Sequence, residues 1–253
     1  MEKLKQQKGY FAGMYSLLFI AVVFSNQVYA EQLSISVGWN KPPYVIEETN
    51  SGFELEMVSD IFNNMGHSVS YVYVPFGRSN TLIKVNKVDA ALTMNEHMET
   101  TNLVLSEPYI SYQNAAISLK GRSIKIYSVA DLKRFSIVAF QNASVVLGNE
   151  YRRVTKTSPL YLELPDQRKQ VEMLLKGKID LVVMDINIFN YLSTELIGAS
   201  HIKNVDIHRL FPKTNYHIAF TDKKLLHAFN KAMKAYKQSD DYTKLVAKYE
   251  FLY

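Results

Sequence analysis

The sequence contains no cysteine among its 253 residues. It therefore offers no disulfide, no thiolate metal ligand, no nucleophilic thiol and no site for a lipid on cysteine. Its six histidines are scattered, with no pair four residues apart and no His-Glu-x-x-His motif. We expect neither a metal centre nor a cofactor, because the usual ligand spacings are missing.

A strong charge of either sign is also missing. The formal net charge is only +5, and lysines alternate with acidic residues along most of the chain. No basic helix with interleaved aromatic residues is evident, so binding to nucleic acid is not expected.

The chain also lacks an apolar run long enough to cross a bilayer. The longest such stretch, Met14 to Phe24, follows Lys3, Lys5 and Lys8 and is shorter than a membrane span. This order is typical of an export signal, and Val28-Tyr29-Ala30 resembles a signal-peptidase site. We predict that residues 1–30 are a signal peptide cleaved after Ala30, which would release a soluble, monomeric periplasmic protein. The alternative is an uncleaved membrane anchor.

What the sequence does contain is an alternation of short β-branched runs and helix-period segments, which favours an α/β fold with largely parallel strands. On one face of Phe53 to Met65, apolar residues recur at helical spacing, and Gly66 follows where a helix cap is expected. The first half contains, by this reading, strands at 33–39, 69–74 and 88–93 and helices at 53–65 and 78–86.

The same rhythm restarts after Tyr127, which suggests a second lobe. It predicts a short helix at 129–133, strands at 135–140 and 179–184, and a helix at 167–175. The last segment, 222–253, has the apolar period of two helices.

Several motifs, in this order and spacing, resemble the family-3 extracellular solute-binding proteins, which are the polar amino-acid receptors of ABC importers. They cover nearly the whole chain after residue 30. The motifs are Gly52-Phe53-Glu54-Leu55-Glu56-Met57, Val88-Asp89-Ala90-Ala91, Leu105-Ser106-Glu107-Pro108-Tyr109, Val129-Ala130-Asp131-Leu132-Lys133, Gly177-Lys178-Ile179-Asp180 and Lys248-Tyr249.

The resemblance implies a periplasmic-binding-protein-like II fold, in which two α/β lobes are joined by two crossing hinge strands. Lobe one would comprise residues 31–118 and 218–253, and lobe two residues 119–217. Segments 114–120 and 215–221 fit the crossing strands. The ligand would lie between the lobes, near helix N-termini and loop amides, and the lobes would close over it.

In lobe one, the resemblance directs attention to polar and aromatic residues at strand ends. Thr93 and Asn95 follow a buried strand and either contact the ligand or cap the next segment. The aromatic residues Tyr44, Phe76 and Tyr109 either stack on the ligand or belong to the core. We expect Trp39 to be buried rather than to bind.

In lobe two, Asn142 and Ser144 lie where the family has a turn that holds a carboxylate. Asn142 tolerates the left-handed backbone that such a turn needs, so this segment either binds an anion or serves as an ordinary helix cap. Asp185 matches the family position that accepts hydrogen bonds from a ligand's amino group. The alternative for Asp185 is an N-cap of the helix 186–196.

The chain departs from the family at one charged position. The arginine that grips the ligand's α-carboxylate in amino-acid receptors falls at Glu99, so the usual bidentate clamp is missing. Arg78 either replaces it or lies in solvent. The resemblance therefore supports the predicted fold more firmly than it supports an ordinary α-amino acid as the ligand.

The resemblance implies a protein that catalyses nothing. It would capture a small, polar, amino-acid-like solute and deliver it to an ABC permease. Two alternatives remain: a sensor partner that presents its ligand to a membrane receptor, and an enzyme similar to cyclohexadienyl dehydratase. Glu96, His97 and Glu99 are the candidate acid–base groups for such an enzyme, but no matching second group is evident.

Overall fold

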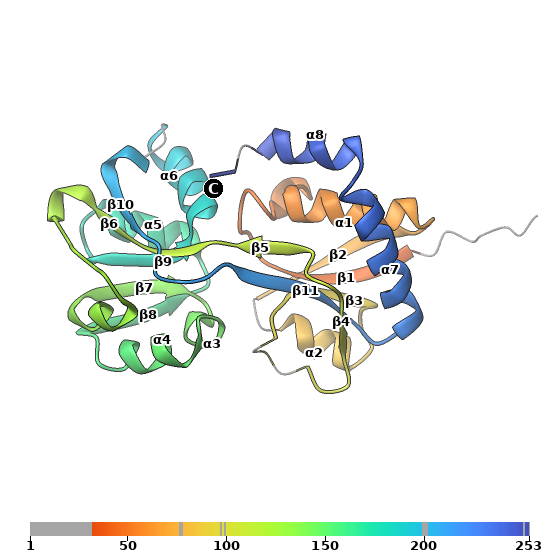
Figure 1. The fold of residues 1–253 in the computed structure, drawn as a ribbon, viewed down its shortest axis with the longest axis horizontal. Helices are drawn as coiled ribbons and strands as arrows, with labels where there is room; N and C mark the ends of the chain where they lie inside the picture. Colours follow the sequence, from red (N-terminus) through yellow and green to blue (C-terminus); the bar gives the residue numbers. More distant parts are fainter. Residues whose placement is uncertain are drawn as a thin grey trace, which may run out of the picture.

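The computed structural model describes residues 32–75, 78–96, 98, 100–198, 202–249 and 251–252. The predicted signal peptide and Phe76 lie outside these residues. Figure 1 shows two lobes side by side, each built around one β-sheet with helices on its faces. The predicted two-lobed α/β architecture is confirmed.

The first sheet has the strand order β2-β1-β3-β11-β4, and β5 also pairs with β11. Strands β1, β2 and β3 run parallel, whereas β11 is antiparallel to its neighbours. Its strands are β1 (Gln32–Gly38), β2 (Ser68–Val74), β3 (Ala90–Met94), β4 (Val104–Leu105), β5 (Ile110–Tyr112) and β11 (Thr214–Phe220). Its helices are α1 (Phe53–Asn64), α2 (Ser79–Lys84), α7 (Lys223–Tyr236) and α8 (Asp240–Tyr249).

The second sheet has the order β10-β6-β9-β7-β8. Strand β7 is parallel to β8 and β9, and β6 is antiparallel to β9 and β10. Its strands are β6 (Asn114–Leu119), β7 (Ser136–Phe140), β8 (Leu160–Leu164), β9 (Leu181–Asp185) and β10 (Val205–His208). Its helices are α3 (Ala143–Val146), α4 (Gly148–Thr155), α5 (Gln167–Leu175) and α6 (Ile186–Ile197), with a 3₁₀ helix, η3 (Val129–Arg134), where a short helix was predicted.

The two crossings between the sheets come slightly before the expected lobe boundaries. Strand β5 belongs to the first sheet and β6 to the second, so the chain crosses at Gln113 rather than at residue 118. It returns between His208, the end of β10, and Thr214, the start of β11, rather than at residue 217. Each predicted crossing strand therefore lies within a single sheet, and the links just before them join the lobes (Figure 1).

Helix α1 begins where a glycine permits two chain segments to touch. Gly52 has φ of +116°, and a Cβ atom there would lie 2.4 Å from the carbonyl oxygen of Tyr44. The approach lets the carbonyls of Pro43 and Tyr44 accept hydrogen bonds from the first two amides of α1, on Phe53 and Glu54, at 3.0 Å each. The loop before α1 is thereby fixed against the helix.

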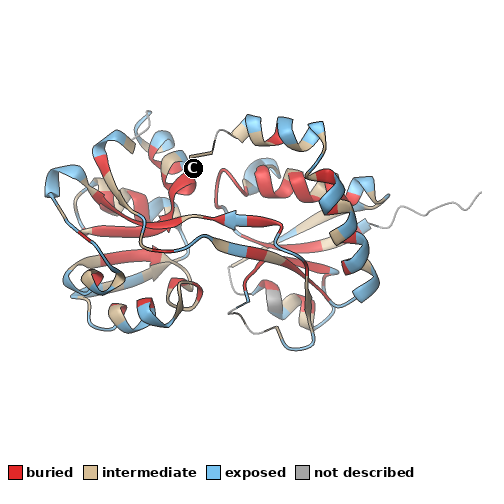
Figure 2. Ribbon diagram, viewed as in Figure 1, coloured by how far each residue is buried: buried red, intermediate tan, exposed pale blue. Residues whose placement is uncertain are grey.

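Buried residues run through both sheets (Figure 2). The inward face of α1 is apolar at helical spacing, as predicted, and α1 packs against α7 and α8, which completes lobe one. One apolar cluster extends from the first sheet through β5 and β6 into the second. The site described next lies between the two lobes.

Candidate functional site

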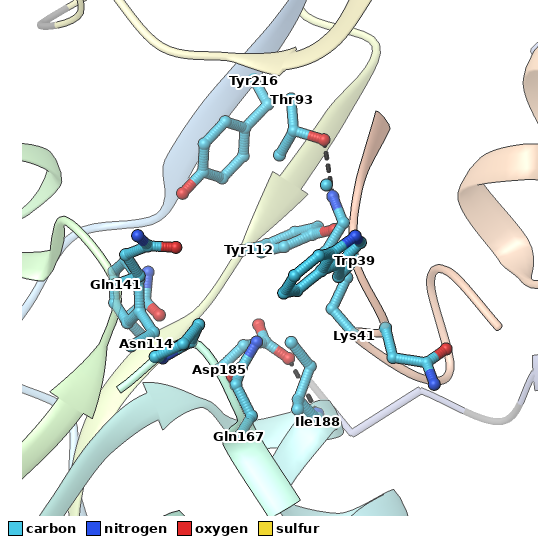
Figure 3. Close-up of a pocket in the computed structure, with 14 residues that line it drawn as sticks. Trp39, Lys41, Thr93, Tyr112, Asn114, Gln141, Gln167, Asp185, Ile188 and Tyr216 are labelled. Atoms are coloured by element: carbon cyan, nitrogen blue, oxygen red, sulfur yellow. Dashed lines mark hydrogen bonds between the residues drawn. The ribbon is translucent and has the colours of Figure 1, made fainter. Parts of the chain in front are cut away.

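A cleft that is partly open to solvent lies between the two sheets (Figure 3). It is lined by Gly38, Trp39, Asn40, Lys41, Thr93, Tyr112, Asn114, Phe140, Gln141, Pro165, Gln167, Asp185, Ile188 and Tyr216. Both lobes contribute, since lobe one supplies Trp39, which follows β1, and Thr93 of β3, and lobe two supplies Phe140 of β7 and Asp185 of β9.

On lobe two, Asp185 ends the central strand β9 and caps helix α6. Its Oδ1 accepts hydrogen bonds from the amides of Asn187, at 2.9 Å, and Ile188, at 3.1 Å, and from the Tyr44 hydroxyl, at 3.2 Å. Its Oδ2 accepts from the amide of Gln113 at 2.8 Å. Asp185 thus has the N-cap role named as the alternative and also lines the cleft, so the two readings do not exclude each other.

Asp185 is only 1% exposed. Burial raises its pKa to about 6, although the backbone amides of Ile188, Gln113 and Asn187 and the Tyr44 hydroxyl act in the opposite direction. No lysine, arginine or histidine in the described part of the chain forms an ion pair with it. A buried carboxylate without a cation is costly, so a cationic ligand group would stabilise it.

On lobe one, a buried ion pair forms the floor of the cleft. Lys41 Nζ lies 2.8 Å from Glu54 Oε2 and donates to Thr93 Oγ1 at 2.5 Å. Glu54 also accepts from the hydroxyls of Thr93, at 2.7 Å, Tyr112, at 2.7 Å, and Tyr109. Burial opposes ionisation of Glu54, but the Lys41 ammonium and these hydrogen bonds outweigh it and lower the pKa of Glu54.

Sequence reasoning missed both members of this pair. Glu54 lies inside the Gly52–Met57 motif that identified the family, yet its side chain was assigned no role. Lys41 precedes Pro42-Pro43 in a loop, and no motif marks it. The available signal was an acidic residue on the apolar face of a helix, since such a residue needs a buried partner.

The remaining lobe-one candidates lie at or below this floor. Thr93 lines the cleft, and its hydroxyl accepts a hydrogen bond from Lys41. Asn95 is buried and donates to the carbonyl of Asn215 at 3.3 Å. Tyr109 is buried and hydrogen-bonded to Glu54, so its ring belongs to the core and does not line the cleft.

Tyr44 also lies beneath the cleft instead of lining it. Its ring is 2% exposed and stacks on Tyr112, at 4.1 Å between centroids, and on Phe251, at 5.1 Å. Its hydroxyl accepts from Asn187 Nδ2 at 3.0 Å and donates to Asp185. Tyr44 therefore links the two lobes through the group that caps α6.

The predicted anion site in lobe two is occupied from within the chain. The amides of Asn142 and Ser144 donate to the two carboxylate oxygens of Glu163 at 2.7 and 2.8 Å. Asn142 has φ of 64°, so the left-handed backbone inferred from its sequence is present. The turn has the geometry expected for binding an anion, but the anion it holds is a side chain of strand β8.

Arg78 is exposed, precedes α2 and does not line the cleft. Phe76 and Glu99 lie outside the described residues.

Aromatic rings form much of the cleft wall, from Trp39, Tyr112, Phe140 and Tyr216. Trp39 is 48% exposed, so the expectation of a buried indole was wrong. It follows the last residue of β1, where the strand pattern ends and the side chain turns toward the cleft (Figure 3). Between the aromatic residues, Gln141 Oε1 is buried without a hydrogen-bond partner.

Within the residues that the structure describes, no His, Asp or Glu cluster could hold a metal ion. Across the same residues, no helix is both long and apolar enough to span a bilayer.

The chain matches the family model for bacterial extracellular solute-binding proteins, family 3, over residues 33–252. A comparison with curated protein sequences finds no match.

Among solved structures, the chain is similar to an ancestral arginine-binding protein bound to arginine (22% identity, TM-score 0.70, covering 87% of this chain and 98% of that one). It is also similar to a histidine kinase sensor domain with similarity to periplasmic binding proteins (17%, 0.72, 87% and 96%). A third similar structure is an ancestral amino-acid-binding protein, a precursor of cyclohexadienyl dehydratase (18%, 0.70, 86% and 95%). At these identities the structures establish a shared fold.

Proposed function

The chain belongs to the family-3 bacterial extracellular solute-binding proteins, and from this premise we propose that it captures a small polar solute with an amino group in the cleft between its lobes. It would act in the periplasm as a monomer, without catalysis, and deliver the solute to an ABC permease. The signal-like residues 1–30 support export.

The observation that carries the proposal is Asp185. Its carboxyl group is buried beside the cleft, its pKa is raised to about 6, and no described side chain supplies a countercharge. An ammonium group on the ligand would neutralise Asp185 when the lobes close around it. The hinge links at Gln113 and between β10 and β11 support such a closure.

A thermal-shift screen tests the proposal, because a ligand that binds only the folded state raises its melting temperature. The panel should contain amino acids, polyamines, small carboxylates and short peptides, with hits confirmed by titration calorimetry. Solution scattering should then show a smaller radius of gyration with bound ligand. If amine-bearing compounds give no shift while simple carboxylates do, the proposed role of Asp185 is wrong.

A second candidate function is ligand presentation to a signalling receptor, which the similarity to a histidine kinase sensor domain favours. Both functions would use the same closed cleft. Neighbouring genes for a permease and an ATPase would favour transport, whereas a neighbouring receptor gene would favour signalling.

A further inference from the structure

The charges around the cleft bear on the class of solute. Lys41 is the only lysine or arginine among the described lining residues, and Glu54 at 2.8 Å neutralises its charge. The amides of Asn142 and Ser144 are already occupied by Glu163. No described cationic side chain is thus left at the cleft wall for a ligand carboxylate.

The polar groups that do remain include two acceptors for a cation. Asp185 carries an uncompensated carboxylate, and Gln141 Oε1 is a buried acceptor with no donor. Figure 3 shows these two side chains on the lobe-two side of the cleft, with Trp39 and Tyr112 facing them. Aromatic faces attract ammonium groups, so the rings and the two acceptors all favour a positively charged ligand group.

The cleft continues into a mouth with an excess of acidic residues. A second pocket shares Trp39, Asn40, Pro165 and Gln167 with the cleft and extends outward from them. Its charged residues are Glu47, Glu48, Asp166, Arg168 and Glu195.

The only cation among the described residues that line this mouth is already paired, since Arg168 Nη1 lies 2.5 Å from Glu195 Oε1. Asp166 is paired as well, since Lys169 Nζ lies 3.4 Å from its Oδ2. Glu47 and Glu48 then leave a local negative charge on a chain whose net charge is +5. The acidic mouth is thus a local feature, and a cleft lined by one sign of charge concentrates ligands of the opposite sign.

We propose that the cleft binds an aliphatic diamine without a carboxylate, with one ammonium at Asp185 and Gln141 and the other at Glu47 and Glu48 of the acidic mouth. This inference rests on the proposed function and specifies its ligand class. An α-amino acid would bring a carboxylate for which the described wall offers no free cation.

Three ligands that differ by single groups test the inference by titration calorimetry. Cadaverine is L-lysine without its carboxylate, and n-pentylamine is cadaverine without its second amine. We expect cadaverine to bind at least about tenfold more tightly than either, since each comparison alters one charge-assisted contact. L-lysine binding as tightly as cadaverine would overturn the diamine class while leaving the proposed capture of an amine-bearing solute intact.

If none of the three binds but another amine in the screen does, only the diamine inference fails. If no amine of any kind binds, the proposed function fails with it.

Charge-removing variants then test the mouth. Glu47→Gln together with Glu48→Gln should weaken cadaverine binding by roughly twofold to fivefold per carboxylate, because both are exposed. Binding of n-pentylamine should not change. Glu150→Gln, on the exposed side of α4 and outside both pockets, is the matched control. Equal losses for cadaverine and n-pentylamine would show that the mouth holds no second ammonium.

Discussion

The two lobes each bring one buried carboxylate to the cleft, and the two carboxylates are treated in opposite ways. Glu54 of lobe one is 0% exposed, paired with Lys41 and has a lowered pKa. Asp185 of lobe two is 1% exposed, has no described cationic partner and has a pKa raised to about 6.

The difference separates a structural charge from a charge that is available to a ligand. Glu54 needs nothing more, since Lys41 and three hydroxyls surround it. Asp185 is held in place by amides but keeps its charge uncompensated. Lobe one therefore provides a carboxylate whose charge is already neutralised. Lobe two provides a carboxylate whose charge a bound ligand cation would neutralise.

The largest expected effect is on the lobe-one pair. Glu54→Gln should lower the free energy of unfolding by about 3–5 kcal/mol, because it leaves the Lys41 ammonium buried without its partner. Urea unfolding measures this change. The matched control is Glu56→Gln, two residues along the same helix, whose ion pair with Lys248 is partly exposed and should contribute at most about 1 kcal/mol. If the two variants lose equal free energy of unfolding, the buried Lys41–Glu54 pair is no more important for stability than the partly exposed Glu56–Lys248 pair.

Much of the fold behind this comparison was predictable from residue periodicity. Helix α5 has the predicted limits, and α1 ends one residue before the predicted end, with Met65 as its cap. The crossings were placed less well. Strand propensity identifies β6 and β11 as strands but contains no information about which sheet each one joins.

The site was less predictable than the fold. Asp185 could be found because it lies at the end of a buried strand and directly before a helix. The Lys41–Glu54 pair could not, because it depends on how the loop before α1 is folded against that helix. The segment with Asn142 and Ser144 was predicted either to bind an anion or to cap a helix. The partner of its amides, Glu163, comes from another strand, and one sequence does not reveal that pairing.

The next effect is on ligand affinity in lobe two. Asp185→Asn should reduce affinity for an amine ligand roughly tenfold to a hundredfold, since a charge-assisted hydrogen bond contributes about 1.5–3 kcal/mol. Stability should hardly fall, because Asn caps helices as well as Asp. Titration calorimetry and urea unfolding of the same preparation give both numbers. Unchanged affinity for a cationic ligand would leave Asp185 with a capping role alone.

A pH series sharpens the comparison further. The Asp185 pKa is about 6, so its carboxyl is mostly ionised at pH 7 and mostly protonated at pH 5. An amine ligand prefers the ionised form, so its affinity should fall about tenfold from pH 7 to pH 5. Glu54 does not titrate in this range, because its pKa is lowered below the ordinary value. The Asp185→Asn variant should show a flat profile, and a wild-type profile that is equally flat would contradict the raised pKa.

The smallest expected effect concerns Tyr44, which joins the two lobes beneath the cleft. Its hydroxyl donates to Asp185 Oδ1 at 3.2 Å and so favours the ionised carboxylate. Tyr44→Phe keeps the ring stacked on Tyr112 and removes this donor, together with the acceptor of the hydrogen bond from Asn187 Nδ2. A hydrogen bond contributes about 0.5–1.5 kcal/mol, so the midpoint of the affinity–pH curve should move upward by about 0.4–1 pH unit. Affinity at pH 8, where Asp185 is ionised in both proteins, should change little.

Tyr71→Phe is the control, because that hydroxyl contacts Ser59 and the carbonyl of Leu55, away from the cleft. A large loss at pH 8 with no midpoint shift would instead indicate that the Tyr44 hydroxyl contacts the ligand, and the floor of lobe one would then take part in recognition.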